Sequence, residues 1–362
     1  MPSKDNPADE PSRRWEPRWR RGIVEADLPA LEEISLQIAP SGWNSRVRLF
    51  VHLCSGGRRR WDLAHCIEIG ASHLAAPIAV VRVDPLVDAD ADLFRVPYLD
   101  WIIELIVAGH VCGAFGSPPC STISKARHRP ITGCPFAPRP LRSRTNVWNG
   151  LPGRSRREVE AVATGSYLML VCIGLLGECS IRGAWTGLEH PADPGTPYPS
   201  FIPTVEFQRW VSQHRLVVFE LDQCMFGART RKPTAIAITP KHTRHLRKRC
   251  RHSSHPAMVG PTANGSFATR PMAAYPQGLC EALAKAFVAH LDDAAKHGGG
   301  PPLATKPLGV HPLFWYGIGN AVRHNPRTAG WQWPEPRAGF LANILSARNT
   351  EEIPSGTRMP QQ

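Results

Sequence analysis

The sequence predicts an α/β fold, because short apolar runs typical of strands alternate with longer segments of helical spacing. Apolar residues alternate over residues 47–53, and a β-branched run covers residues 78–83. Small apolar residues over 111–115 are typical of a buried strand. Helices are expected between these strands, one ending near Ile69 and one over residues 99–108.

Strands and helices continue to alternate in the second half of the chain. We expect an antiparallel pair of strands at residues 216–219 and 234–238, because two apolar runs flank a short basic turn. An amphipathic helix is expected from Gln277, with Leu279 and Leu283 near one face. The other expected elements are a helix over residues 158–177, a strand over 184–188 and a helix over 208–213.

Composition divides the chain into three parts. Residues 1–45 form a charged, Pro-rich basic arm, with a short amphipathic helix expected over residues 26–38. Residues 46–292 carry the alternating strands and helices, and residues 239–274 form a short basic insert within them. Residues 293–362 are rich in Gly, Pro and Trp without clear periodicity, so we expect a poorly ordered extension there.

The chain is basic, since 43 Lys and Arg against 30 Asp and Glu give a formal net charge of +13. This charge favours a polyanionic partner, most simply nucleic acid. Ten irregularly spaced cysteines and no apolar signal segment indicate a nuclear or cytoplasmic protein with reduced thiols, not a secreted one. The longest apolar run, residues 167–176, is too short to span a membrane, so we expect no membrane partner. We expect a monomer.

Two stretches concentrate the basic residues. Residues 127–157 are rich in Arg, Pro and Gly and are expected to form a long surface loop over Cys120. Residues 241–252 are the densest basic stretch of the chain. Both are suited to phosphate contact, and a merely solvated basic surface is the alternative. With Lys232 of the preceding turn, the candidate nucleic-acid contacts are Arg142, Arg144, Lys232, Arg244, Arg247, Lys248 and Arg249.

The same basic insert contains several potential zinc ligands. They are Cys250, His252, His255, His242 and His245. Their spacing matches no established zinc finger, and only one cysteine is among them. We therefore expect no metal site and favour phosphate contact for this segment.

Residues 116–120, Gly-Ser-Pro-Pro-Cys, directly follow the expected strand over 111–115. The two prolines fix their own φ and restrict the residues before them, so this loop is rigid. It holds Cys120 at the carboxyl end of a strand, where open α/β sheets place their chemistry. A catalytic thiol is one interpretation, and a buried structural cysteine is the other.

Other strand ends carry residues suited to a nucleotide-type ligand. The strand over 47–53 ends in the Gly-rich turn Cys54-Ser55-Gly56-Gly57, whose backbone N–H groups can meet such a ligand. Asp84 ends the next strand, where a carboxylate can accept hydrogen bonds from ribose hydroxyls, and an ordinary turn aspartate is the alternative. Glu189 ends the strand over 184–188, as a general acid or as a salt-bridged carboxylate.

Taken in order over residues 46–290, these motifs resemble the cytosine-C5 DNA methyltransferase family, most of all its divergent members from phages and retroelement-rich genomes. Cys54 to Gly57 resembles the family's glycine-rich motif, and residues 116–120 resemble its proline-cysteine motif. Residues 188–191 are similar to the glutamate motif, and residues 226–232 to the tyrosine-glycine segment that precedes Gln-x-Arg-x-Arg. Asp84 falls at the ribose-binding acid, and residues 275–284 fall at the final cofactor-side helix.

The chain departs from this family in several places. The first motif lacks the Phe-x-Gly-x-Gly form, and His190 follows the glutamate where asparagine is usual. Thr230 stands where glutamine is expected, with Arg231 and Lys232 supplying charge. The segment between the expected strand at 234–238 and Tyr275 is too short for a full target-recognition domain, so the resemblance does not imply sequence-specific DNA recognition.

The resemblance implies a Rossmann-like, S-adenosyl-L-methionine-binding sheet and methylation of DNA cytosine at C5 through a covalent cysteine adduct. Cys120 would add to C6, and Glu189 would meet N3 and the exocyclic amine. Arg229 or Arg231 would hold the base oxygen or orient Glu189. The implied cofactor contacts are Cys54, Ser55, Gly56, Gly57, Asp84, Ser117 and Pro118.

Two other classes of function bear on the same residues. The first alternative is a degenerate member of the family, of mobile-element origin, that keeps the fold and only binds nucleic acid. A zinc-dependent deaminase is excluded, because the chain has no His-x-Glu and residue 123 is Ile instead of a second cysteine.

Overall fold

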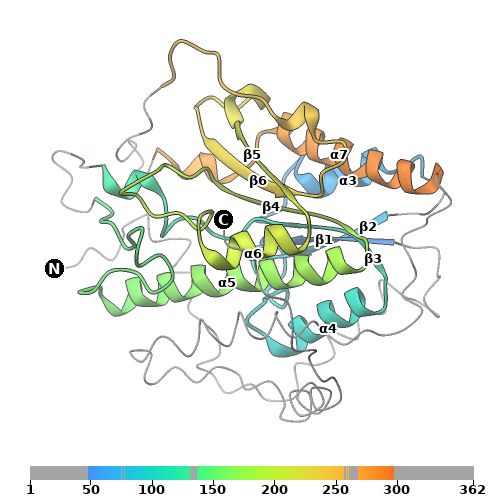
Figure 1. The fold of residues 1–362 in the computed structure, drawn as a ribbon, viewed down its shortest axis with the longest axis horizontal. Coiled ribbons are helices and arrows are strands. Elements are labelled where there is room, and N and C mark those ends of the chain that lie inside the picture. The colour runs from blue at the N-terminus through green and yellow to red at the C-terminus, as the bar shows by residue number, and fades with distance from the viewer. Residues whose placement is uncertain are drawn as a thin grey trace, which may run out of the picture.

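Six strands form one mixed sheet with helices on both faces (Figure 1). This architecture comes from a computed structural model that describes residues 48–74, 76, 78–129, 131, 137–256, 258, 260 and 268–296. The helix expected over residues 26–38 and the extension beyond residue 296 lie outside the described residues. The α/β class expected from the alternating strands and helices is confirmed.

The order of the strands across the sheet is β2-β1-β3-β4-β6-β5. Strands β1 to β4 run parallel to one another, and β6 lies antiparallel between β4 and β5. The antiparallel pair expected from the two apolar runs and their basic turn is therefore confirmed. The bounds are β1 Arg48–Leu53, β2 Ile78–Val83, β3 Val111–Gly116, β4 Trp185–Pro191, β5 Val217–Asp222 and β6 Pro233–Ile238.

Strand β4 is longer than the sequence indicates. Its parallel pairing with β3 ends at Leu188, but its antiparallel pairing with β6 continues through Pro191. Glu189 therefore lies opposite Ile236 within the sheet, instead of in the loop that follows it.

Helices cover the two faces of the sheet in two separate groups (Figure 1). Helices α3 (Leu63–Gly70) and α7 (Gln277–Lys296) pack against each other on one face. The other face carries α4, α5 and α6, which span Val96–Val107, Arg156–Ile181 and Val205–Gln213. The period-two pattern of β1 produces this separation, since Leu49 and Val51 belong to the core under α4 and α5, whereas Phe50 belongs to the core under α3 and α7.

Aromatic rings fill the core between the sheet and α7. The ring of Phe50 lies 4.8 Å from that of Phe287 and 6.0 Å from that of Trp185, measured between centroids. This close approach requires glycine at position 113 of β3, because a Cβ there would lie 2.5 Å from Phe287 and 2.8 Å from Phe50. The glycine and the rings thus form one packing unit.

Helix α5 is the longest element and lies across β3 and β4. It begins with a capping box, in which Ser155 and Glu158 each bond to the backbone N–H of the other. By length and composition α5 could cross a membrane, which corrects the expectation that the apolar run over 167–176 is too short. Because 56% of its most apolar window is buried against the rest of the domain, the described residues give no strong membrane signal.

Replacing Gly113 by alanine should destabilise this fold, because neither Phe287 nor Phe50 has room to yield to a new Cβ. We expect a loss of about 1–3 kcal/mol in the free energy of unfolding, measured as a lower urea midpoint. Gly70→Ala is the matched control, since its Cβ would meet only Val288 at 3.6 Å. A Gly113→Ala midpoint equal to that of the wild type would contradict this packing.

Candidate functional site

One row of the sheet joins the last paired residues of four parallel strands. Leu53 pairs with Val83 of β2 and with Gly116 of β3. Gly116 pairs in turn with Leu188 of β4. The residues that come next in the chain therefore share the carboxyl edge of the sheet, and they are Cys54, Asp84, Ser117 and Glu189.

Asp84 ties the turn after β1 to the end of β2. The N–H of Gly56 donates to its Oδ2 at 2.9 Å, and the N–H of Leu86 donates to its Oδ1 at 2.9 Å. Cys54 and Gly56 both have positive φ, 55° and 70°, which folds the turn back toward Asp84. Burial raises the pKa of Asp84, and the two N–H bonds oppose that rise. Each carboxylate oxygen keeps a further lone pair for a ligand.

The turn after β1 borders open space. A Cβ placed on Gly56 or on Gly57 would meet no atom within 4 Å. Leu86, directly after the Asp84-Pro85 pair, is 55% exposed. The Cys54 thiol points elsewhere, since its Sγ lies 4.0 Å from that of Cys172 in α5. The backbone of the turn therefore borders open space next to Asp84, and an exposed apolar side chain follows two residues after this carboxylate.

Ser117 belongs to a chain of hydrogen bonds that ends at Glu189. The Oη of Tyr275 lies 2.7 Å from Ser117 Oγ and 3.0 Å from Glu189 Oε2. Tyr275 has one hydroxyl proton and a carboxylate only accepts, so Tyr275 donates to Glu189 and Ser117 donates to Tyr275. His52 Nε2 lies 3.3 Å from Ser117 Oγ and completes the chain as its donor. Burial lowers the pKa of His52 to about 4, so it is neutral at pH 7.

Lys232 is the cation of this site. Its Nζ lies 3.5 Å from Glu189 Oε1, and both side chains are largely buried. Burial alone would lower the pKa of Lys232, but Glu189 and then Cys120 reverse that effect and raise it. The pKa of the Cys120 thiol is raised by burial and by Glu189, while Lys232 opposes the rise. Cys120, Glu189 and Lys232 are thus electrostatically coupled in one partly buried group.

Arg142 is buried next to the loop that carries Cys120 and offers no charge at the surface. Its side chain is 0% exposed, which corrects the expected contact with nucleic acid. Its Nε donates to Thr122 Oγ1 at 3.0 Å, and its Nη2 donates to the carbonyl of Val162 in α5 at 2.8 Å. Burial lowers its pKa to about 9, so the guanidinium remains charged at pH 7. Arg142 therefore fixes the loop just after Cys120 on helix α5.

Other predicted site arginines are engaged elsewhere or exposed. Arg144 forms a bidentate pair with Asp193, with Nη2 2.8 Å from Oδ2. Arg231 donates from Nε to Asp222 Oδ1 at 2.9 Å, and Arg229 is exposed. The position beside Glu189 that was expected for Arg229 or Arg231 is held by Lys232, which was expected to contact phosphates. Pro118 is buried.

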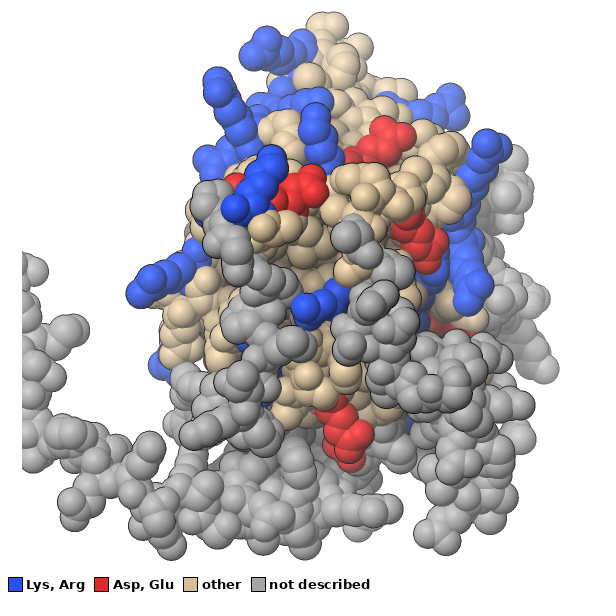
Figure 2. Space-filling view, turned by 90° about the vertical axis from the view of Figure 1, so that its right-hand side faces the viewer, with Lys and Arg blue, Asp and Glu red and all other residues tan. Residues whose placement is uncertain are grey.

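Residues 240–249 of the basic insert follow the outermost strand β5, from the amino ends of the parallel strands to their carboxyl ends. The insert starts after β6 at a shallow hollow of about 710 Å³, whose lining includes Arg244, Arg247 and Lys285. The carbonyl of Lys248 then accepts from the N–H of Asp222, at the edge that carries Glu189. Arg244, Arg247, Lys248 and Arg249 are all exposed. Figure 2 shows Lys and Arg side chains projecting from the upper part of one face, with fewer Asp and Glu between them.

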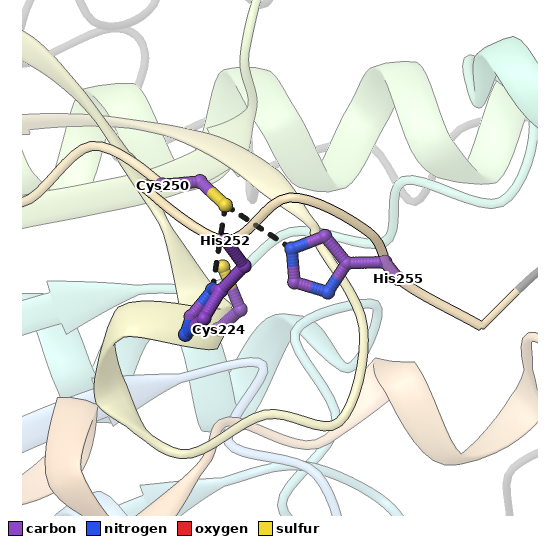
Figure 3. A group of neighbouring side chains, drawn as sticks. All are labelled: Cys224, Cys250, His252 and His255. Atoms are coloured by element: carbon purple, nitrogen blue, oxygen red, sulfur yellow. Dashed lines mark hydrogen bonds between the residues drawn. The ribbon is translucent and has the colours of Figure 1, made fainter.

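Three parts of this arrangement were not predicted from the sequence. His52 and Tyr275 join the Glu189 network although neither has a motif signal of its own, and Tyr275 was expected only at the start of a helix. Cys224 lies within 4.8 Å of donor atoms of Cys250, His252 and His255 (Figure 3), whereas the sequence suggested only one cysteine for that group. Each of these residues meets partners that are distant in the sequence, so no local spacing reveals the contact.

Comparison with known proteins adds no assignment to this geometry. No protein-family model matches the chain, and no curated protein sequence matches it.

Proposed function

We propose that this protein is an S-adenosyl-L-methionine-dependent methyltransferase with a Rossmann-like sheet, acting on cytosine C5 of DNA. The observation that carries the proposal is the row of residues at the carboxyl edge of β1 to β4. Four features meet there in the order that the family resemblance implies: a candidate cofactor turn, a candidate ribose acid, the Ser117–Cys120 loop and a candidate catalytic glutamate.

The residues around Asp84 fit this cofactor chemically. The free lone pairs of Asp84 suit the two hydroxyls of a ribose, and exposed Leu86 offers an apolar surface for a flat base. Open space beside Gly56 and Gly57 leaves room for the methionine part. When bound, the cofactor supplies an electrophilic methyl group on a sulfonium.

Cys120 is the proposed nucleophile that attacks the cytosine base. A thiolate that adds to C6 of cytosine makes C5 electron-rich, which C5 needs before it can accept a methyl group. Lys232 stabilises the negatively charged form of the thiol, since it is the described cation that opposes the rise in its pKa. Once C5 carries the methyl group, a base such as water takes the C5 proton, and the electrons of that bond re-form the C5–C6 double bond as the thiolate leaves C6, which restores the aromatic ring and the free enzyme.

Glu189 is the proposed contact for N3 and the exocyclic amine of the base. In the structure Tyr275 donates to Glu189 Oε2, while Oε1 is buried without a hydrogen-bond partner and lies 3.5 Å from Lys232 Nζ. Oε1 therefore keeps its accepting capacity for a cytosine, and the base has to leave the DNA stack to reach it. Exposed Lys248, at the same edge of the sheet, is placed to hold a phosphate of the distorted strand, whereas the neighbouring Arg249 is paired with Glu220 and Asp222.

A second candidate function is nucleic-acid binding without catalysis. It is favoured by the contacts that already engage Glu189 within the protein, an ion pair with Lys232 and a hydrogen bond from Tyr275, and by a thiol whose pKa is raised instead of lowered. In that case the exposed basic insert remains functional while Cys120 and Asp84 have only structural roles.

The full chain should bind S-adenosyl-L-methionine with micromolar affinity in calorimetric titration. Asp84→Ala should weaken binding at least about tenfold, or about 1.4 kcal/mol, because it removes the ribose acceptor and frees the turn. Asp292→Ala, at a partly exposed position of α7, is the control and should bind like the wild type. Absence of wild-type binding at millimolar cofactor would leave the non-catalytic function.

The pH dependence of Cys120 alkylation tests the coupling of the three charged groups. Because its pKa lies above the ordinary value of 9.0, iodoacetamide modification should keep rising above pH 9. Lys232→Met should raise that pKa and slow modification at pH 8, whereas Glu189→Gln should lower it and speed modification, by about tenfold per pKa unit. Peptide mass spectrometry separates Cys120 from the other thiols.

Arg229→Met is the matched control for that experiment, since it removes an exposed cation of the same turn. Its rate should equal that of the wild type. If Lys232→Met and Glu189→Gln were both alkylated at the wild-type rate, neither charge would act on the Cys120 thiol.

A further inference from the structure

Four side chains with sulfur or imidazole donors converge beside the candidate site (Figure 3). They are Cys224, Cys250, His252 and His255, and their donor atoms all lie within 4.8 Å of one another. Cys250 is central to the group, with its Sγ 3.1 Å from His255 Nε2 and 3.5 Å from His252 Nδ1.

These separations are close to those that a tetrahedral zinc ion imposes. Zinc lies about 2.3 Å from thiolate sulfur and about 2.0–2.1 Å from imidazole nitrogen, so neighbouring donors sit about 3.4–3.8 Å apart. The two Cys250 distances lie within about 0.5 Å of that range. No two donor atoms of the group lie more than 4.8 Å apart, so no pair has to close by more than about 1.4 Å to reach that range.

The backbone around Cys250 is held in place by Asp222, which is 0% exposed. The N–H of Cys250 donates to Asp222 Oδ2 at 2.8 Å, while the N–H of Asp222 donates to the Lys248 carbonyl at 2.9 Å. Cys224 lies two residues after Asp222, in the short helix η5 (Gln223–Phe226). The two cysteines are therefore brought together by hydrogen bonds of Asp222 that involve none of the four sulfur and imidazole donor side chains.

We propose that Cys224, Cys250, His252 and His255 bind one Zn²⁺ as a structural site. Two thiolates and two imidazoles form a complete tetrahedral set that leaves no position for a substrate. Soft sulfur with imidazole also selects zinc over magnesium or calcium, which prefer oxygen donors. On binding, each cysteine loses its proton to solvent and each imidazole binds through a neutral nitrogen, so the step needs no oxidant or reductant.

Such a zinc ion would clamp the basic insert to the turn that carries Lys232. Gln223, next to Cys224, donates its N–H to the Lys232 carbonyl at 3.1 Å and its Nε2–H to Thr234 Oγ1 at 3.0 Å. The ion therefore joins residues 250–255 to the backbone of Lys232. This role does not depend on the methyltransferase proposal, and it holds equally for a nucleic-acid-binding protein.

Metal content of the full chain, purified under reducing conditions without chelator, tests the proposal. We expect about one equivalent of zinc per chain by plasma mass spectrometry. After chelator treatment, Co²⁺ should give the visible bands of a tetrahedral ion and thiolate-to-cobalt charge transfer. Cys250→Ser and His255→Ala should lose the metal, whereas Cys66→Ser and His73→Ala, outside the group, should retain it.

A further variant guards against simple unfolding. Cys250→His keeps four donors, so it should still bind Co²⁺ with about half of the charge-transfer intensity. The proposal is overturned by a wild-type chain without stoichiometric metal and without a tetrahedral Co²⁺ spectrum. It is equally overturned by undiminished metal in Cys224→Ser/Cys250→Ser, or by a Cys224–Cys250 disulfide in the chain purified under reducing conditions.

Discussion

The register of four parallel strands is the constraint on which the candidate site depends. Leu53, Val83, Gly116 and Leu188 share one row, so the residue that follows each of them reaches the same edge. A shift of one residue in any strand would turn its end to the other face of the sheet. The aromatic core under α7 fixes this register, because Phe50, Phe287 and Gly113 fit together in one arrangement.

The candidate site is also electrostatically constrained, because it holds a buried carboxylate, a buried ammonium and a thiol together. Glu189 and Lys232 compensate each other, and removing either one leaves an uncompensated buried charge. Tyr275 and Ser117 orient the carboxylate through neutral hydrogen bonds that reach His52. Strand β6 makes this possible, because its antiparallel direction brings Lys232, at its start, to the carboxyl edge of β4.

The sequence predicted the α/β class and the individual strands well, because period-two runs such as residues 78–83 are local signals. It also singled out Cys120, Asp84 and Glu189 as candidates, because each lies at the end of such a run or in the loop after it, and their catalytic and binding roles stay predictions. It misplaced Arg142, since a basic Pro-rich loop gives no sign that one guanidinium turns inward to bind Thr122 and α5. The sequence could not show which of the adjacent basic residues, Arg231 or Lys232, would lie beside Glu189. Only the pairing of β6 with β4 decides this.

Covalent trapping on DNA tests the central claim most directly. A pool of duplexes with 5-fluorocytosine in place of cytosine cannot release the C5 substituent as a proton, so the thiol should remain on C6 after methyl transfer. We predict an adduct that survives denaturing electrophoresis, requires S-adenosyl-L-methionine and disappears in Cys120→Ser. An adduct that persists in Cys120→Ser, or none from a wild-type chain that binds both cofactor and DNA, would contradict the account.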